Sequence, residues 1–152
     1  MSEILDSGER RTFDTGAVRD IQDGKGRPSL MPLKVVAHLL RTHAGGDYIL
    51  DKIADFTEDS YTKHLYLALA GFAALAYNDS VETMILETAK HFEDGARKYG
   101  ENNWQKGIPV NCYLDSAIRH YMKYRRGDTD ENHARSFVWN IMCLCWEVDY
   151  HD

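Results

Sequence analysis

Apolar residues begin to recur at helical spacing shortly after residue 31. Leu33, Val36 and Leu40 lie three to four positions apart, a spacing that places them on one face of an amphipathic helix. Pro32 suits the first turn of a helix, and a pair of glycines after the segment stops the pattern. The sequence therefore predicts a helix over residues 32–43.

The same spacing predicts further helices along the rest of the chain. They cover residues 48–56, about 60–77, 81–99, 113–126 and 131–148. The helix over 81–99 has the clearest ends, because Asp79 and Glu82 have the spacing of a capping box and Gly100 stops the pattern. The segment from Leu65 to Tyr77 is apolar around its circumference, so its helix is expected at the centre of the protein or at a subunit interface.

The first 31 residues show no helical period. They are rich in glycine, and their acidic and basic side chains nearly balance, which argues against a polybasic tail. Residues 100–111 also have the composition of a loop. No segment alternates apolar and polar positions for long, so strands are not expected. The sequence predicts one all-α domain over 1–152, a bundle of five or six helices preceded by an irregular arm over 1–31.

Charge and composition narrow the classes of function. The 152 residues carry a formal net charge of −6, which disfavours a protein that mainly binds nucleic acid but suits a site where divalent cations bridge to phosphates. No uncharged apolar stretch reaches the roughly 20 residues that cross a bilayer, and the N-terminal segment lacks the apolar part of a secretory signal. Three scattered cysteines do not form a disulfide framework. We expect a cytoplasmic protein that contacts no membrane.

Two predicted helices carry polar side chains that could form a site. On the helix over 81–99, four charged or titratable residues share one face: Glu87, His91, Asp94 and Lys98. On the helix over 113–126, Asp115 and Arg119 are four positions apart, with His120 next to them. Each set can be a solvent-exposed face with ion pairs, and a site requires that the two faces meet.

The last predicted helix has a polar line on an otherwise apolar element, formed by His133, Ser136, Asn140 and Cys143. An unpaired buried polar group costs about 1 to 3 kcal/mol, so these side chains must be hydrogen-bonded or bound to something. Two interpretations therefore remain: polar side chains hydrogen-bonded within the core, or a binding site. Asp130 and Glu131, just before this helix, are either helix-capping residues or metal ligands.

Several ordered blocks of the sequence resemble one known family. They run from Phe13 to Arg27, from His91 to Gly100, from Asn103 to Gly107, from Tyr113 to His120 and from Asp128 to Asn140. Each block is short, but together they keep their order and span most of the chain. On these residues the chain resembles the dATP/dGTP diphosphohydrolase family of tailed bacteriophages, whose members are MazG-like nucleotide pyrophosphohydrolases.

This resemblance implies an activity and its cofactor. The expected enzyme hydrolyses dGTP or dATP to the monophosphate and pyrophosphate with Mg²⁺ or Mn²⁺, as a homo-oligomer such as a dimer or tetramer. In phages with 2-aminoadenine genomes, the dGMP would supply synthesis of the modified base. Residues 33–80 are interpreted as a helical insertion relative to short members of the family.

The resemblance also implies roles for particular residues. Metal binding is expected from Glu93, Asp115, Asp130, Glu131 and His133. Catalytic roles fall to Glu93, His120, Glu131 and Lys98. Lys98 and Arg119 would hold phosphate oxygens, Asn103, Trp104 and Asn140 would contact base or sugar, and Arg19, Lys25 and Arg27 would close over the phosphates.

One departure from the family pattern motivates an alternative function. The Glu-x-x-Glu and Glu-x-x-Asp pairs typical of MazG proteins are absent from the helices where they are expected. The alternative is a phage protein on the same scaffold that binds nucleotide or a host partner without catalysis.

Overall fold

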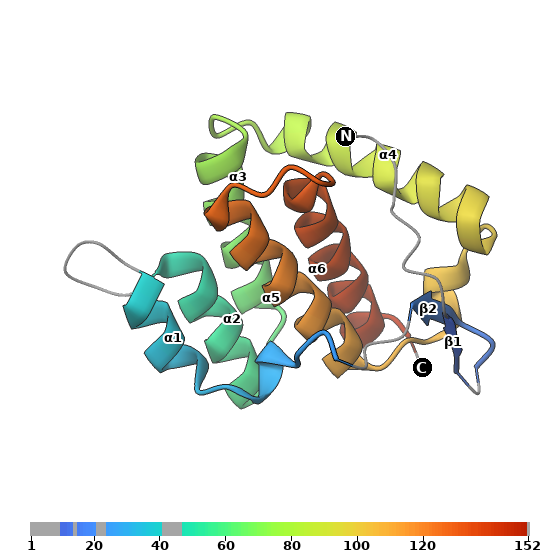
Figure 1. The fold of residues 1–152 in the computed structure, drawn as a ribbon, viewed down its shortest axis with the longest axis horizontal. Coiled ribbons are helices and arrows are strands. Elements are labelled where there is room, and N and C mark those ends of the chain that lie inside the picture. Colours follow the sequence, from blue (N-terminus) through green and yellow to red (C-terminus); the bar gives the residue numbers. More distant parts are fainter. Residues whose placement is uncertain (1–9, 14, 21–23, 41–46, 152) are drawn as a thin grey trace.

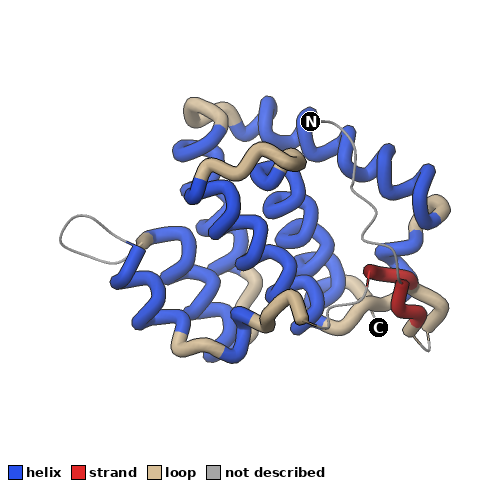
Figure 2. Tube along the Cα trace, viewed as in Figure 1, coloured by secondary structure: helices blue, strands red, loops and turns tan. Residues whose placement is uncertain are grey.

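The structure is a computed structural model that describes residues 10–13, 15–20, 24–40 and 47–151, and these residues are mostly helical (Figures 1 and 2). The α-helices are α1 (Leu33–Leu40), α2 (Tyr48–Asp59), α3 (Lys63–Ala76), α4 (Val81–Tyr99), α5 (Val110–Arg126) and α6 (His133–Asp149). The all-α prediction is therefore confirmed. The end of the first predicted helix, beyond Leu40, lies outside the described residues.

Helices α5 and α6 form the centre of the bundle and pack along each other. On one side α3 contributes Phe72, whose ring lies 4.6 Å from that of Phe137 on α6 and 6.1 Å from that of Tyr121 on α5. Helices α1 and α2 pack together on this side, and α4 lies across the other side against α6 (Figure 1). The apolar helix α3 buries only one face within the chain, because Tyr66 and Leu75 are about half exposed.

The helix caps differ from the predicted ones at two positions. Helix α4 begins after Ser80, whose hydroxyl accepts a hydrogen bond from the Thr83 N–H, whereas Asp79 has a left-handed backbone with φ of 65°. Helix α6 begins after Asn132, whose side chain accepts from the Arg135 N–H. Glu131 therefore lies in the turn before α6 and not in its first turn.

The predicted irregular arm contains a small ribbon. Strands β1 (Arg10–Thr12) and β2 (Val18–Asp20) pair antiparallel, with Thr12 opposite Val18, and a turn that includes Gly16 at φ +88° joins them. Each strand has three residues, which is too short for an alternating pattern to show in the sequence. A short 3₁₀ helix, η1 (Pro28–Leu30), follows and contacts α5.

A second 3₁₀ helix, η2 (Asn103–Lys106), lies between α4 and α5 within the predicted loop. The Asn103 side chain accepts from the Val18 N–H and donates to the Val18 carbonyl, both at 3.0 Å, and so joins η2 to β2. No helix of the described segments is both long and apolar enough to cross a bilayer.

Candidate active site

A cleft of about 820 Å³ opens between α4, η2, α5, α6 and the arm. Most of the predicted site residues line it: Arg19, Lys25, Glu93, Asn103, Trp104, Arg119, His120, Glu131 and Asn140. Residues of both α4 and α5 therefore line the same cleft. The helix geometry is held in part by the ion pair between Arg135 of α6 and Asp94 of α4, whose side chains are 3.0 Å apart and largely buried.

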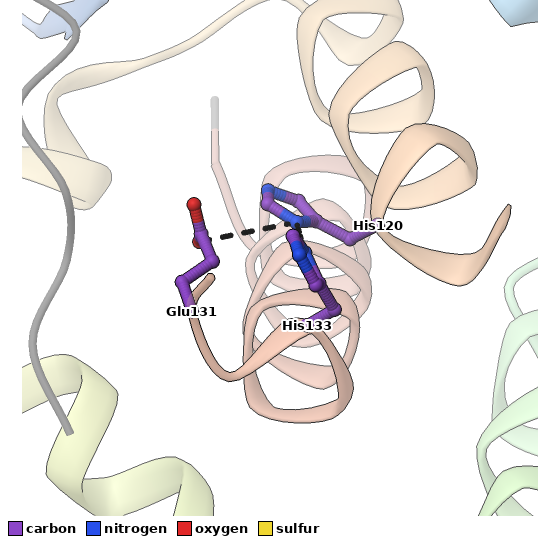
Figure 3. Close-up of side chains that lie close together, drawn as sticks. All are labelled: His120, Glu131 and His133. Carbon is purple, nitrogen blue, oxygen red and sulfur yellow. Dashed lines mark hydrogen bonds and ion pairs between the residues drawn. The ribbon is translucent and has the colours of Figure 1, made fainter. Parts of the chain in front are cut away.

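One side of the cleft holds a compact group of possible metal ligands, His120, Glu131 and His133 (Figure 3). The Nδ1 atoms of the two histidines are 2.9 Å apart, and Glu131 Oε1 is 4.0 Å from His120 Nδ1. The Ser136 hydroxyl donates to Glu131 Oε1 at 3.2 Å. Burial, followed by the electrostatic effect of the neighbouring His133, holds the pKa of His120 well below its usual range, so the His120 imidazole is neutral near pH 7. Two imidazoles and a carboxylate are donors that can hold a divalent cation.

Three other residues lining the cleft carry buried nitrogen atoms without a hydrogen-bond partner among the described residues. They are Nη1 of Arg19, Nδ1 of His91 and Nε1 of Trp139. The rings of His91 and Trp139 are 5.3 Å apart. Burial lowers the pKa of His91 to about 3, with smaller contributions from Arg135 and Arg19, so this ring is also neutral. Native proteins rarely leave buried polar nitrogens unpaired, so these three are available to bond water or a ligand in the cleft.

Trp139 and Lys123 line the cleft but were not among the predicted site residues. Trp139 lay within a family block and His91 on a polar helix face, so both carried a signal in the sequence. Lys123 follows His120 by three positions on α5, which places the two side chains on the same face of that helix. That spacing was the available signal for Lys123.

Asp115 does not line the cleft and instead holds the arm. Its side chain is fully buried, with Oδ2 accepting from Arg27 Nε at 3.0 Å and Oδ1 from the Ser29 N–H at 2.8 Å. Arg27 is thereby turned toward this anchor. Arg119, which does line the cleft, also donates from Nη1 to the Gly26 carbonyl at 2.6 Å.

The other predicted residues lie around the cleft at different depths. The side chain of Glu93 is 66% exposed at the rim and pairs with Arg97 at 3.3 Å. The Lys98 ammonium lies 5.1 Å from the centre of the Tyr99 ring. Asp130 Oδ1 lies 2.7 Å from His133 Nε2. The structure thus brings Glu131 to the two histidines but does not place Glu93 or Asp115 in that group. Their metal-binding roles stay predictions.

The fold is all-α, and its cleft carries cationic, aromatic and histidine side chains, including a group that could hold a cation. A family model described as "dATP/dGTP diphosphohydrolase, N-terminal" matches residues 74–151, just over half of the chain. The chain belongs to the dATP/dGTP diphosphohydrolase family, and the resemblance seen in the sequence is confirmed. The matched range includes α4, η2, α5 and α6 but not the arm. No curated protein matches the chain, and neither does any solved structure.

Proposed function

We propose that this cleft hydrolyses dGTP or dATP to the deoxynucleoside monophosphate and pyrophosphate, with the help of a divalent cation. The observation that carries the proposal is the composition of the cleft. Cationic side chains, aromatic rings and a histidine–carboxylate group line one cavity of about 820 Å³. Each of these three suits one part of a nucleoside triphosphate with its cation: the phosphates, the base and the metal ion.

The cationic side chains would bind the triphosphate. A nucleoside triphosphate carries about four negative charges at neutral pH, and the chain as a whole has a net charge of −6. Arg19, Lys25, Arg119 and Lys123 bring positive charge to the cleft. Arg119 presents a planar guanidinium that can hold two phosphate oxygens at once.

The aromatic residues and the unpaired nitrogens would bind the base and sugar. Trp104 and Trp139 line the cleft and offer faces for stacking. An acceptor atom of the ligand would satisfy the unpaired indole N–H of Trp139, whose burial without a partner costs about 1 to 3 kcal/mol. The amides of Asn103 and Asn140 already bond Val18 and Ser136, so in this proposal they hold the walls of the cleft in place.

The group of His120, Glu131 and His133 would hold the cation. A divalent ion there supplies positive charge against the phosphate oxygens and the charge that develops at the α-phosphorus. The carboxylate of Glu131 would also be the base that takes a proton from the attacking water, since it lines the cleft beside His120. Pyrophosphate then leaves, with its charge met by the cationic side chains.

Product analysis tests the proposal. The full chain is incubated with dGTP or dATP and with Mg²⁺, Mn²⁺ or Co²⁺ in turn, and the products are separated by ion-exchange chromatography. We expect the monophosphate and pyrophosphate. Tripolyphosphate as the product, or no turnover of any triphosphate, would remove the proposal.

A variant pair tests the assignment of Glu131. Glu131→Gln should abolish turnover while changing nucleotide binding much less, because the amide keeps the size but cannot accept the proton. Glu101→Gln makes the same chemical change at an exposed residue of the same cleft and should keep turnover. If Glu131→Gln turns over at the normal rate, this assignment is wrong.

The alternative function makes a different prediction. A nucleotide-binding protein without catalysis would bind dGTP tightly without a metal ion and release no pyrophosphate.

Within the leading proposal, dGMP formed in a phage-infected cytoplasm would feed 2-aminoadenine synthesis where the genome contains that base. The predicted homo-oligomer belongs to the same proposal, and the neighbouring exposed side chains of Ile85 and Leu86 on α4 offer it an apolar surface.

A further inference from the structure

We propose that His120, Glu131 and His133 form a site for a transition-metal ion that accepts imidazole ligands, in preference to Mg²⁺. The inference rests on the proposed function for the role of the ion in the reaction. Its structural support and its test concern only the binding of the metal.

The donor atoms decide between the two kinds of ion. Mg²⁺ demands oxygen ligands in an octahedron and is bound through carboxylates, water and phosphate. Here two of the three donors are imidazole nitrogens, His120 Nδ1 and His133 Nδ1, and only Glu131 gives oxygen. Two histidines and a glutamate are a donor set that suits Zn²⁺ and similar ions such as Co²⁺, Fe²⁺ and Ni²⁺. The residues present therefore fit Mg²⁺ poorly.

The separations are close to those of a metal site. With metal–nitrogen bonds of about 2.0 to 2.1 Å in a tetrahedron, two ligand nitrogens lie about 3.3 Å apart. The two Nδ1 atoms are 2.9 Å apart, so they need to separate by only a few tenths of an ångström. Glu131 Oε1 is 4.0 Å from His120 Nδ1 and needs to move less than 1 Å toward it, which a rotation of the Glu131 side chain can supply.

The surrounding hydrogen bonds orient the donors as metal sites do. Asp130 Oδ1 lies 2.7 Å from His133 Nε2, and when this nitrogen carries the proton, Nδ1 presents its lone pair toward His120. The Ser136 hydroxyl, 3.2 Å from Glu131 Oε1, restrains the carboxylate in the same way. Such a carboxylate behind a ligating histidine fixes both the tautomer and the ring orientation.

The position of the group gives the ion an open side. His120 and Glu131 line the cleft, whereas His133 lies behind them and is buried. An ion held by three protein donors keeps at least one coordination position for water or a ligand, and here that position would face the cleft.

Without an ion, the same two nitrogens can share one N–H···N hydrogen bond at the observed distance. The test must therefore separate a metal site from a hydrogen-bonded pair. Metal-stripped full-length protein is titrated with Co²⁺ alone and with a large excess of Mg²⁺, and the visible absorption of the cobalt complex is followed. We expect one Co²⁺ per chain, a band that excess Mg²⁺ does not remove, and displacement of Co²⁺ by Zn²⁺.

Variants locate the bound ion. His120→Gln and Glu131→Gln should each weaken Co²⁺ binding at least about tenfold, and Asp130→Asn by about 10- to 100-fold although it is no ligand. His38→Gln changes an exposed histidine on α1 and should leave the band unchanged. His133 is 2% exposed, so circular dichroism must first show that His133→Gln is folded. The side chain of His120 is 18% exposed, and His120→Gln gives an independent variant.

Three outcomes would overturn the inference. The first is equal Co²⁺ binding by the wild-type protein and the folded double variant of both histidines, and the second is competition by Mg²⁺ at similar concentration. The third is no Co²⁺ uptake, which would mean a hydrogen-bonded pair only. Pyrophosphate release with Mg²⁺ in a protein that takes up no Co²⁺ would support the proposed function and contradict the metal-site inference. Co²⁺ binding without any hydrolysis would support the metal-site inference and contradict the proposed function.

Discussion

Asp115 anchors the arm to the bundle, and replacing it with Asn should have a measurable cost. The buried carboxylate accepts from Arg27 Nε at 3.0 Å and from the Ser29 N–H at 2.8 Å. Asn has almost the same size, but it has one acceptor oxygen and no charge. Asp115→Asn therefore tests the two hydrogen bonds with little change in packing.

The expected magnitude follows from these two bonds. A hydrogen bond to a charged group contributes about 1.5 to 3 kcal/mol, and a neutral one about 0.5 to 1.5 kcal/mol. Asn keeps a neutral bond to the Ser29 N–H and loses the charged bond to Arg27. The Arg27 side chain is 43% exposed and can turn into water, which places the loss at the lower end of the range. We expect the free energy of unfolding to fall by about 2 kcal/mol.

Urea unfolding with an unchanged m-value measures this loss. Asp55→Asn is the matched control, because Asp55 pairs with Lys34 at 2.6 Å in a partly exposed position on α2 and should cost at most about 1 kcal/mol. Loosening of the arm should also raise KM for the triphosphate, since Arg19 and Lys25 reach the cleft from the arm. Unchanged stability together with a collapse of kcat would refute the anchoring role and favour Asp115 as a metal ligand.

Three further changes test the cleft. Trp139→Phe keeps a ring but removes the unpaired N–H, so the Kd for nucleotide measured by calorimetry should rise up to about tenfold while the stability of the free protein does not fall. Burial lowers the folded-state pKa of His91 to about 3, so as the pH falls the unfolded chain binds a proton at His91 before the folded chain does. The free energy of unfolding should therefore fall between about pH 6.5 and 3, by up to about 1.4 kcal/mol per pH unit. In urea unfolding at a series of pH values, His91→Gln should flatten this dependence. Arg119→Lys keeps the charge but loses the planar fork, so steady-state kinetics should show a raised KM for the triphosphate; an unchanged KM would mean that Arg119 serves only the arm.

The helices could be predicted because their signals are local. The range predicted for α4 agrees with Val81–Tyr99, since apolar spacing and a terminal glycine define it. The caps were harder, because several capping residues follow one another before α4 and before α6. Only the backbone angles select Ser80 and Asn132. The ribbon in the arm was missed because its short β2 strand is held by Asn103, which is 85 positions away in the sequence.

The candidate site was predictable in its parts but not in its assembly. His120, Glu131 and His133 were all named from the sequence, partly through the resemblance that the family match over residues 74–151 confirms. Their meeting depends on how α5 packs along α6 and on the turn that leaves Glu131 outside the helix. Apolar spacing fixes which face of each helix is buried, but not the register between the two helices. The anchoring contacts of Asp115 likewise come from a segment 86 to 88 positions away.

The Asn103 side chain forms hydrogen bonds only with backbone atoms of Val18, its N–H and its carbonyl. These hydrogen bonds do not depend on which side chains the arm carries. Neighbouring positions, including residue 19, which lines the cleft, can therefore change from one relative to another while the arm stays bound at the same place. Ligand preference in this fold has a route to diverge through a few arm residues, with the helices left intact.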